Sequence, residues 1–392
     1  MGSINQSDLP DSTSPTLALV HPTKEELLQQ SIKNGASWRG ALSIEAYLRR
    51  EDHLAQQELT KDGGITWWAL VDTAAEKRSV LSGCETLRKK ALLAQDGTVK
   101  DVLCHGIGSV FCPLEFRRRG YAARMMKELG KKLQTWQAEG VECLFSVLYS
   151  DIGKQFYAAH GWKPFDSSHI SVHAAEKPVN GSMKPQNLPE ARPLYASDLA
   201  ELCKIDEELL RKKMAGLASG GKTAVAMIPD IETIRWHHAR EEFVANELYG
   251  KTPTIKGAIV GNESGKRIWC YWTRVWANSD PQQSKGNVLH VLRLVVEDDA
   301  GSEDDLSNTP AIAALLAMAQ SEAAKWHMAE VETWNPAKTT VAAAQLLEPE
   351  AEVVHRDAES IASLMWYGNQ PVEEGHVGDV VTWLGNEKYA WC

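Results

Sequence analysis

Three consecutive arginines lie between an apolar segment and a segment with helical character, and this arrangement is suited to binding phosphate. Residues 107–112 predict a strand, residues 117–122 a tight basic loop, and residues 123–133 a helix. The loop and the first helical turn present backbone N–H groups without partners, and the helix dipole adds positive potential there. Gly120 lets the backbone approach a ligand closely. The sequence therefore predicts a pyrophosphate site, with a solvated arginine cluster as the alternative. The predicted binding residues of the loop are Arg117, Arg118, Arg119, Gly120, Tyr121 and Ala122.

Two common phosphate-binding patterns do not fit this segment. It contains no G-x-x-x-x-G-K-[ST], and no G-x-G-x-x-G followed by a ribose-binding acid. The pattern is Arg-x-x-Gly-x-Ala between a strand and a helix. It resembles the coenzyme A loop of the GNAT acetyltransferase superfamily, whose signature is Gln/Arg-x-x-Gly-x-Gly/Ala.

A second pattern follows in the order that this resemblance requires. Residues 141–149 predict an apolar strand, and residues 150–162 resemble the second GNAT motif, a helix that ends in Tyr-x-x-x-Gly-aromatic at Tyr157, Gly161 and Trp162. The family often has Asn seven residues before the tyrosine, where this chain has Ser150, a shorter hydrogen-bond donor. The resemblance implies acetyl-CoA as co-substrate. The cofactor-binding residues it adds to the loop are Val110, Phe111, Cys112, Ser150 and Lys154.

Acetyl transfer to an amine needs a neutral amine, donors for an oxyanion and a proton for the leaving thiolate. If the first motif strand separates from its neighbour, the backbone N–H groups of Val110, Phe111 and Cys112 can serve as the donors. Tyr157 is the proton donor to sulfur that the resemblance implies. The alternative for Tyr157 is a buried aromatic residue that packs beside Phe156.

The general base is the least defined part of this chemistry. Glu85 lies in a strand of apolar and small residues, where burial would raise its pKa and let it accept a proton. The alternative is a solvent-facing or cation-paired position. His105 and Glu142 are weaker candidates, and a terminal carboxylate at Cys392 is a further one, because the myristoyltransferases use their terminal carboxylate in this way.

Two other chemistries find little support in the sequence. Cys112 would be the nucleophile of a ping-pong route, but no His-Asp arrangement is visible beside it, so direct transfer in a ternary complex is simpler. The histidines His237, His238 and His327 lack partners at ligand spacing, so no metal is predicted.

The elements that must position these residues form two domains. The chain has 392 residues, of which 43% are hydrophobic and 24% charged, and its net charge is −10. The charge argues against general nucleic-acid binding and favours a cationic small substrate. No membrane span or secretory signal is expected, and seven cysteines without a C-x-x-C pair predict reduced thiols and a cytoplasmic location.

The expected fold is α/β (α+β), a GNAT fold with a mixed central sheet followed by a second GNAT-like unit that lacks the coenzyme A loop. The acids after residue 296 would repel a pyrophosphate there. The predicted organisation is a disordered tail (1–15), a catalytic domain (16–173), a linker (174–191) and a C-terminal domain (192–392). The strands expected in the first domain are 17–20, 65–71, 79–93, 107–112 and 141–149, and the helices are 24–33, 43–57, 123–133 and 150–162. The strands expected in the second are 223–227, 256–260, 267–276, 288–296, 329–333 and 380–384, and the helices are 196–215, 231–248 and 310–326.

Several longer segments are similar to the fungal lysine N6-acetyltransferase family. They include residues 42–48, 59–64 and 84–88 in the first domain and residues 236–243 and 292–295 in the second. The resemblance implies acetylation of the side-chain amine of free L-lysine, with Glu85 and Cys392 as substrate-side candidates. Three alternatives stay open: another small amine such as a polyamine, a protein or histone lysine, or coenzyme A binding without catalysis.

Overall fold

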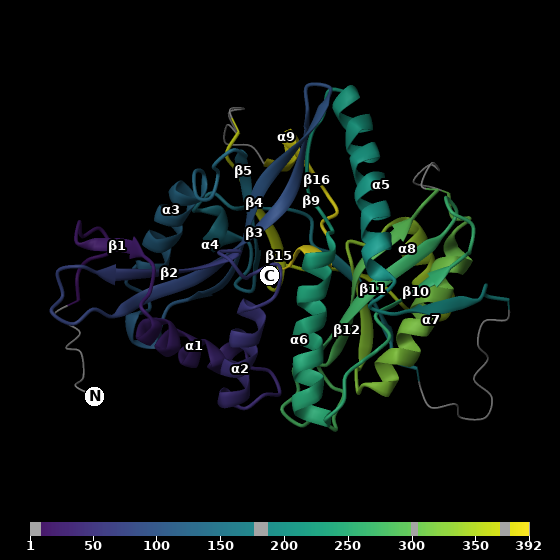
Figure 1. Cartoon of the computed structure of the whole chain (residues 1–392), viewed down its shortest axis with the longest axis horizontal. Coiled ribbons are helices and arrows are strands. Elements are labelled where there is room, and N and C mark those ends of the chain that lie inside the picture. The colour runs from purple at the N-terminus through teal and green to yellow at the C-terminus, as the bar shows by residue number, and fades with distance from the viewer. Residues whose placement is uncertain (1–8, 176–186, 299–304, 369–376, 392) are drawn as a thin grey trace.

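The structure is a computed structural model that describes residues 9–175, 187–298, 305–368 and 377–391 (Figure 1). Two α/β units lie side by side, each built on a mixed sheet, so the predicted fold class is confirmed. Within the described residues the first sheet has nine strands and the second has seven. Helix α6 (Ile231–Tyr249) lies between the units, next to α2 (Ile44–Ala55) of the first.

The first sheet is antiparallel except at two strand pairs, β4 with β5 and β16 with β9. The pairing order runs β1, β2, β3, β4, β5, β15, β6, and β9 pairs with β3 and carries β16 on its other side. Its strands are β1 (Leu17–Val20), β2 (Ile65–Asp72), β3 (Val80–Gln95), β4 (Thr98–Phe111), β5 (Cys143–Ser150), β6 (Lys163–Pro164), β9 (Thr223–Met227), β15 (Ile361–Trp366) and β16 (Val381–Leu384).

The second sheet repeats this plan with one parallel pair, β12 with β13. Its order is β14, β7, β13, β12, β11, β10, β8. Its strands are β7 (Ser168–His173), β8 (Ala191–Leu194), β10 (Gly257–Val260), β11 (Ile268–Val275), β12 (Val288–Val296), β13 (Glu330–Trp334) and β14 (Val353–His355).

The two units exchange strands. In the first sheet β15, from the C-terminal part of the chain, lies between β5 and β6. In the second sheet β7, from the N-terminal part, lies between β13 and β14. The predicted boundary at residues 174–191 is therefore not a boundary between the sheets. Residues 176–186 of the predicted linker lie outside the described residues.

The helices begin where local capping chemistry allows. Thr23 and Glu26 form a capping box at the start of α1, and Ser43 and Asp230 cap α2 and α6 through their side chains. The remaining helices are α1 (Lys24–Trp38), η2 (Leu114–Phe116), α3 (Tyr121–Leu133), α4 (Gln155–Ala158), α5 (Leu199–Ser219), α7 (Thr309–Lys325), α8 (Lys338–Leu347), α9 (Val377–Val380) and η3 (Lys388–Ala390). The sequence analysis did not predict α8, β14 or β15.

A buried ion cluster fixes α6 to the second unit. The Glu241 carboxylate accepts hydrogen bonds from Arg274 (2.8 Å) and from Lys256 (2.9 Å), and Arg274 also donates to Glu322 (2.9 Å). All four side chains are buried. Such pairs tie elements together strongly, since removing one partner costs about 3–5 kcal/mol. The cluster therefore holds one face of α6 rigidly and leaves the opposite face for the first unit.

We expect the exchange of strands to make folding cooperative across the whole chain. A chain that ends at residue 175 would lose β15 and β9 from its sheet, and its β7 would have no partner strand. This fragment should fail to give a cooperative transition in scanning calorimetry, whereas the full chain should unfold in one transition. Two resolved transitions in the full chain would contradict this expectation.

Candidate active site

The two parallel strands of the first unit part at the position where the cofactor cleft was predicted. The last β4–β5 pair is Ile107 with Leu148, whereas β4 continues to Phe111. A bulge in the β3–β4 pairing lies opposite this point, and Ser109 has a φ of 52°. Backbone donors beyond Ile107 therefore have no strand partner on the β5 side.

The predicted basic loop follows directly. Arg118 has a φ of 62°, and Gly120, with a φ of 80°, is the N-cap of α3. The helix begins at Tyr121, two residues earlier than predicted, so Tyr121 and Ala122 lie in its first turn. Arg117 donates from Nε to the Cys112 carbonyl at 3.0 Å and lies over the Phe111 ring. The loop thus combines positive charge, the N–H groups of a helix N-terminus and a glycine that lets a ligand approach the backbone. These features together suit a pyrophosphate.

The segment before β1 lies against this loop instead of forming the disordered tail that was predicted for residues 1–15. Tyr121 donates from its hydroxyl to the Pro10 carbonyl at 2.6 Å, and Arg124 donates to the Ser12 carbonyl at 3.1 Å. A Cβ at Gly120 would lie 2.7 Å from the Ser12 hydroxyl. These hydrogen bonds hold the segment before β1 against the loop and the first turn of α3. Residues 1–8 lie outside the described residues.

An inner cavity of about 210 Å³ lies where β4 and β5 part. Glu85, Val110 and Tyr157 line it together, so the structure brings a carboxylate, a strand backbone and a phenol to one space. The Tyr157 side chain is 7% exposed, and burial raises the pKa of Tyr157 above its usual range. The phenol is therefore protonated at neutral pH and available as a donor.

Glu85 lies at the boundary between the inner cavity and a second, outer cavity. Its Oε1 accepts a hydrogen bond from the Ser109 hydroxyl at 2.8 Å. Burial and, next, the nearby Glu51 carboxylate raise the pKa of Glu85 to about 7, whereas the Ser109 hydrogen bond acts in the opposite direction. A carboxyl group with this pKa can take up a proton near neutral pH.

The outer cavity measures about 460 Å³ and shares six residues with the inner one. Its ionisable lining consists of three carboxylates and one lysine. The buried oxygens Gln30 Oε1 and Asn34 Oδ1 belong to two other lining residues, and neither has a hydrogen-bond partner among the described residues. The space is therefore rich in acceptors. The shared residues are Tyr47, Glu51, Leu54, Glu85, Ser109 and Trp236, and the charged ones of the outer cavity are Lys24, Glu51, Asp52 and Glu85.

Other predicted site residues lie outside these cavities. Ser150 is buried and donates to the Gly153 carbonyl at 2.7 Å, so its hydroxyl closes the turn after β5. Lys154 pairs with Asp357 at 2.5 Å. Cys112 is half-buried, and burial raises the pKa of its thiol, which disfavours a nucleophilic thiolate. Cys392 lies outside the described residues.

The weaker base candidates are also away from the cavities. His105 is buried between Cys143 and Gln137, and burial lowers the pKa of His105 to about 4. Glu142 is exposed. In the described part of the chain no group of three or more His, Cys, Asp or Glu side chains is placed to hold a metal ion. Its helices include none that is both long and apolar enough to cross a membrane.

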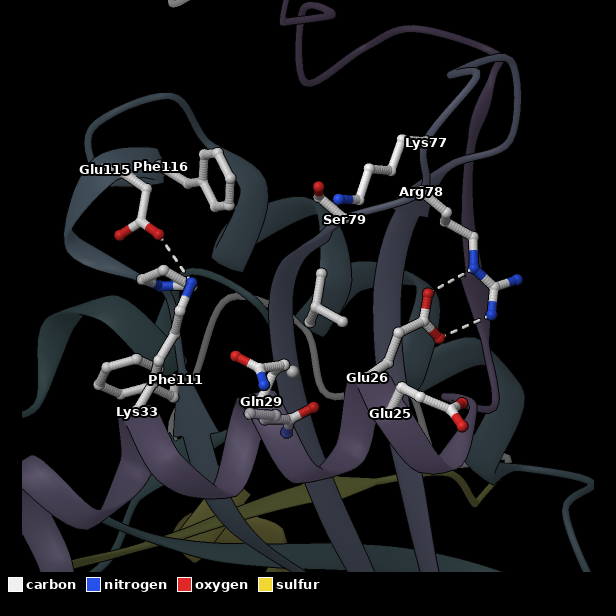
Figure 2. Close-up of a pocket in the computed structure, with 14 residues that line it drawn as sticks. Glu25, Glu26, Gln29, Lys33, Lys77, Arg78, Ser79, Phe111, Glu115 and Phe116 are labelled. Carbon is white, nitrogen blue, oxygen red and sulfur yellow. Dashed lines mark hydrogen bonds and ion pairs between the residues drawn. The ribbon is translucent and has the colours of Figure 1, made fainter. Parts of the chain in front are cut away.

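A third cavity, of about 310 Å³, lies between α1, the β2–β3 loop and the segment after β4 (Figure 2). Its charged side chains largely pair with one another: Arg78 forms two hydrogen bonds with Glu26, both 2.6 Å, and Lys33 pairs with Glu115 at 2.7 Å. It shares no lining residue with the inner cavity. We therefore do not assign it to the reaction.

The corresponding cleft of the second unit is filled by the chain itself. The β12–β13 pairing ends at Val291 with Thr333, and the Glu387 carboxylate then accepts from the Leu294 N–H at 3.1 Å and pairs with Arg293. A carboxylate of the chain thus accepts from a backbone donor of β12 just beyond the end of the parallel pairing. From there the chain runs through η3 to Trp391, which lines the inner cavity of the first unit.

Residues of α2 and α6 complete the inner cavity, and the sequence analysis did not identify them. Arg50 and Glu51 come from α2, and Trp236 and Arg240 from α6. Arg50 is paired with Glu51 at 2.7 Å. Trp236 and Arg240 are four residues apart and so lie on one face of the helix, a spacing visible in the sequence. What the sequence did not show was that this face borders the first unit.

Comparisons with known proteins agree with this architecture. Residues 169–392, more than half of the chain, match the family described as "LYC1 GNAT-like C-terminal domain". A lysine acetyltransferase of Yarrowia lipolytica is 24% identical over 274 residues, which are 61% of this chain and 67% of that protein. The uncharacterized protein YGR111W of Saccharomyces cerevisiae is 21% identical over 399 residues, covering 92% of this chain and 94% of that protein.

Two solved structures share the fold. A probable N-acyltransferase of unknown function from Enterococcus faecalis V583 has a TM-score of 0.53 at 13% identity and covers 90% of this chain and 72% of its own. A GCN5-related N-acetyltransferase from Anabaena variabilis has a TM-score of 0.51 at 14% identity, with 89% and 72% covered. The fold and site define an acyltransferase of the GNAT class. The chain belongs to the family with the LYC1 GNAT-like C-terminal domain, and it resembles fungal lysine acetyltransferase.

We expect Gly120→Ala to weaken coenzyme A binding at least 10-fold. The new Cβ would sit at a positive φ and 2.7 Å from Ser12, so the loop must shift away from its cradle geometry. Isothermal titration calorimetry with coenzyme A measures the effect. The control is Gly140→Ala, which has a similar φ of 79° but open space around the Cβ. Equal affinities in both variants would contradict a role for the loop.

Proposed function

We propose that this protein transfers the acetyl group of acetyl-CoA to the side-chain amine of free L-lysine, directly and within a ternary complex. The observation that carries the proposal is the position of Glu85: it joins the acceptor-rich outer cavity to the inner cavity at the parting of β4 and β5. The lysine acetyltransferase of Yarrowia lipolytica supports the choice of substrate.

In this proposal the co-substrate lies along the first motif. The arginine loop and the first turn of α3 hold its pyrophosphate, and its thioester points into the inner cavity between β4 and β5. The backbone N–H groups beyond Ile107 then face the carbonyl oxygen. The donor chemistry of the loop fits two linked phosphates, as its positive φ residues and helix N-terminus indicate.

The chemical steps use two side chains of the cavity. Glu85 accepts a proton from the substrate ammonium, so that the neutral amine nitrogen attacks the thioester carbon. A C–N bond forms, the C–S bond breaks, and the departing sulfur takes the phenol proton of Tyr157. The nitrogen loses its second proton as the amide forms, and this proton restores the Tyr157 phenol. A raised pKa suits both residues, since it makes Glu85 a stronger base and keeps Tyr157 protonated.

Other features of the chain are consistent with a small-molecule enzyme of the cytoplasm. The cysteines of the described residues are free thiols, as in a reducing compartment. Residues of α2 and α6 line both cavities, whose volumes of about 460 and 210 Å³ suit a free amino acid. A polyamine or a protein lysine remains the second candidate.

A thiol-release assay with acetyl-CoA tests the proposal. L-lysine should give the highest kcat/KM among free amino acids, polyamines and a histone-tail peptide, and mass spectrometry should find the acetyl group on the side-chain amine. Acetylation of the peptide but not of free lysine would refute the proposal. Coenzyme A binding without turnover of any amine would favour a non-catalytic role.

We expect Glu85→Gln to lower kcat about 100-fold, in the usual range for a general base. In the wild type kcat/KM should rise with pH through about 7 and then level off, because Glu85 accepts a proton only when ionised. The variant should lose this inflection. Ser109→Ala is the matched control: it removes the hydrogen bond that stabilises the carboxylate, so the inflection should move to higher pH. A pH profile unchanged in both variants would exclude Glu85 as the base.

A further inference from the structure

One cation of the inner cavity forms no ion pair with any of the residues that the structure describes. Arg240 lines the cavity, and among the described residues its guanidinium forms no ion pair and no hydrogen bond. The guanidinium makes a cation–π contact with the Trp391 ring, whose centre lies 5.8 Å from the guanidinium carbon. Burial lowers the pKa of Arg240 to about 9, with Arg50 as the nearest like charge. Arg240 is half-buried, and a partly desolvated charge is stabilised by an anionic partner.

Glu51 is the nearby carboxylate that favours the charged form of Arg240, but it forms no ion pair with it. Arg50, on α2, is already paired with Glu51 at 2.7 Å. Glu241, the next residue of α6, points about 100° away around the helix and is buried with Arg274 and Lys256. The helix is held in this orientation by that cluster, so Arg240 remains directed to the first unit.

The acyl donor does not supply the missing anion either. In the proposed function its phosphates lie at the arginine loop, and its thioester and pantetheine carry no charge. The carboxylates Glu85 and Asp151 also line the cavity, but among the described residues neither forms an ion pair with Arg240, so we look to the acceptor substrate for the anion that pairs with it. A carboxylate matches a guanidinium, since two parallel N–H···O bonds can form.

We propose that Arg240 binds the α-carboxylate of an amino-acid substrate and thereby selects free amino acids over amines that lack this group. The assignment rests on the proposed function for the reaction, and it names the part of the substrate that α6 recognises. It places the second unit in substrate recognition, although that unit's own cofactor cleft is filled by Glu387.

The test compares two acceptors that differ by one carboxylate, L-lysine and 1,5-diaminopentane. In Arg240→Gln, kcat/KM for L-lysine should fall about 10- to 100-fold, whereas the value for the diamine should change less than 3-fold. Arg240→Lys should restore part of the preference. The control is Arg235→Gln, on the same helix but exposed, which should leave both substrates unaffected. Equal losses for the two acceptors would show a structural role and overturn the assignment.

Thermal unfolding provides a readout that does not need turnover. Arg240→Gln removes an uncompensated charge, so its Tm should equal or exceed that of the wild type, whereas a structural role predicts a lower Tm. L-lysine should raise the Tm of the wild type and of Arg235→Gln but not of Arg240→Gln. The diamine should not distinguish the three proteins.

The two proposals fail in different ways. If the wild type acetylates neither acceptor, the proposed function fails, and a panel of amino acids with their decarboxylated amines in the same Tm measurement still decides the role of Arg240. The assignment stands if carboxylate-bearing compounds stabilise the wild type selectively over Arg240→Gln. It is overturned if both proteins respond alike or if no carboxylate stabilises either.

Discussion

The parting of β4 and β5 after Ile107 is the constraint on which the site depends. A parallel pair that stays closed satisfies its backbone groups internally and leaves no opening. Here the pairing stops, a bulge at Ser109 turns the strand, and the chain continues into the arginine loop and α3. The end of this pairing leaves backbone donors of β4 without a partner on β5, opens the inner cavity and leads the chain to the N-terminus of α3. One irregularity thus sets the positions of the cofactor loop and of Glu85 together.

The second unit shows what happens when such an opening is filled. Its parallel pair also ends early, at Val291, but Glu387 accepts from the Leu294 N–H and pairs with Arg293. In this unit a segment of the chain itself therefore lies beside the end of the parallel pair. The C-terminal part of the chain places Trp391 in the inner cavity of the first unit. The second unit also contains α6, which the buried Glu241 cluster holds in place. The second unit thus contributes lining residues to the cavity of the first.

Local features were predictable from the sequence because local chemistry determines them. The start of the first helix at residue 24, the glycine at position 120 before the third helix and the strand at residues 288–296 follow from nearby residues alone, and the structure has all three. The exchange of β7 and β15 was not predictable, because an apolar strand pattern is the same whichever sheet it joins. Residues 9–15 were taken for a tail because they are polar, yet their carbonyls meet Tyr121 and Arg124.

Some residues of the candidate site could be predicted from the sequence and others could not. Glu85 and Tyr157 lie on elements whose order matches the motif, so their shared cavity could be inferred from one sequence. The place of Trp236 and Arg240 in this cavity could not be inferred, because it depends on which unit each face of α6 contacts, and the sequence of α6 alone does not show that. A helix packed on two sides gives no clear amphipathic signal.

The charges of the inner cavity describe its ligand more closely than its shape does. Arg50 and Glu51 neutralise each other. The other acidic and basic side chains of the lining are two carboxylic acids, Glu85 and Asp151, and one guanidinium, Arg240. Two carboxylates and one guanidinium are the complement of a molecule with two ammonium groups and one carboxylate. A diamine would leave the guanidinium uncompensated, and a lysine within a peptide would bring no carboxylate to it. The proposed substrate, free lysine, would match all three charges, and an unmatched charge is costly at low effective dielectric.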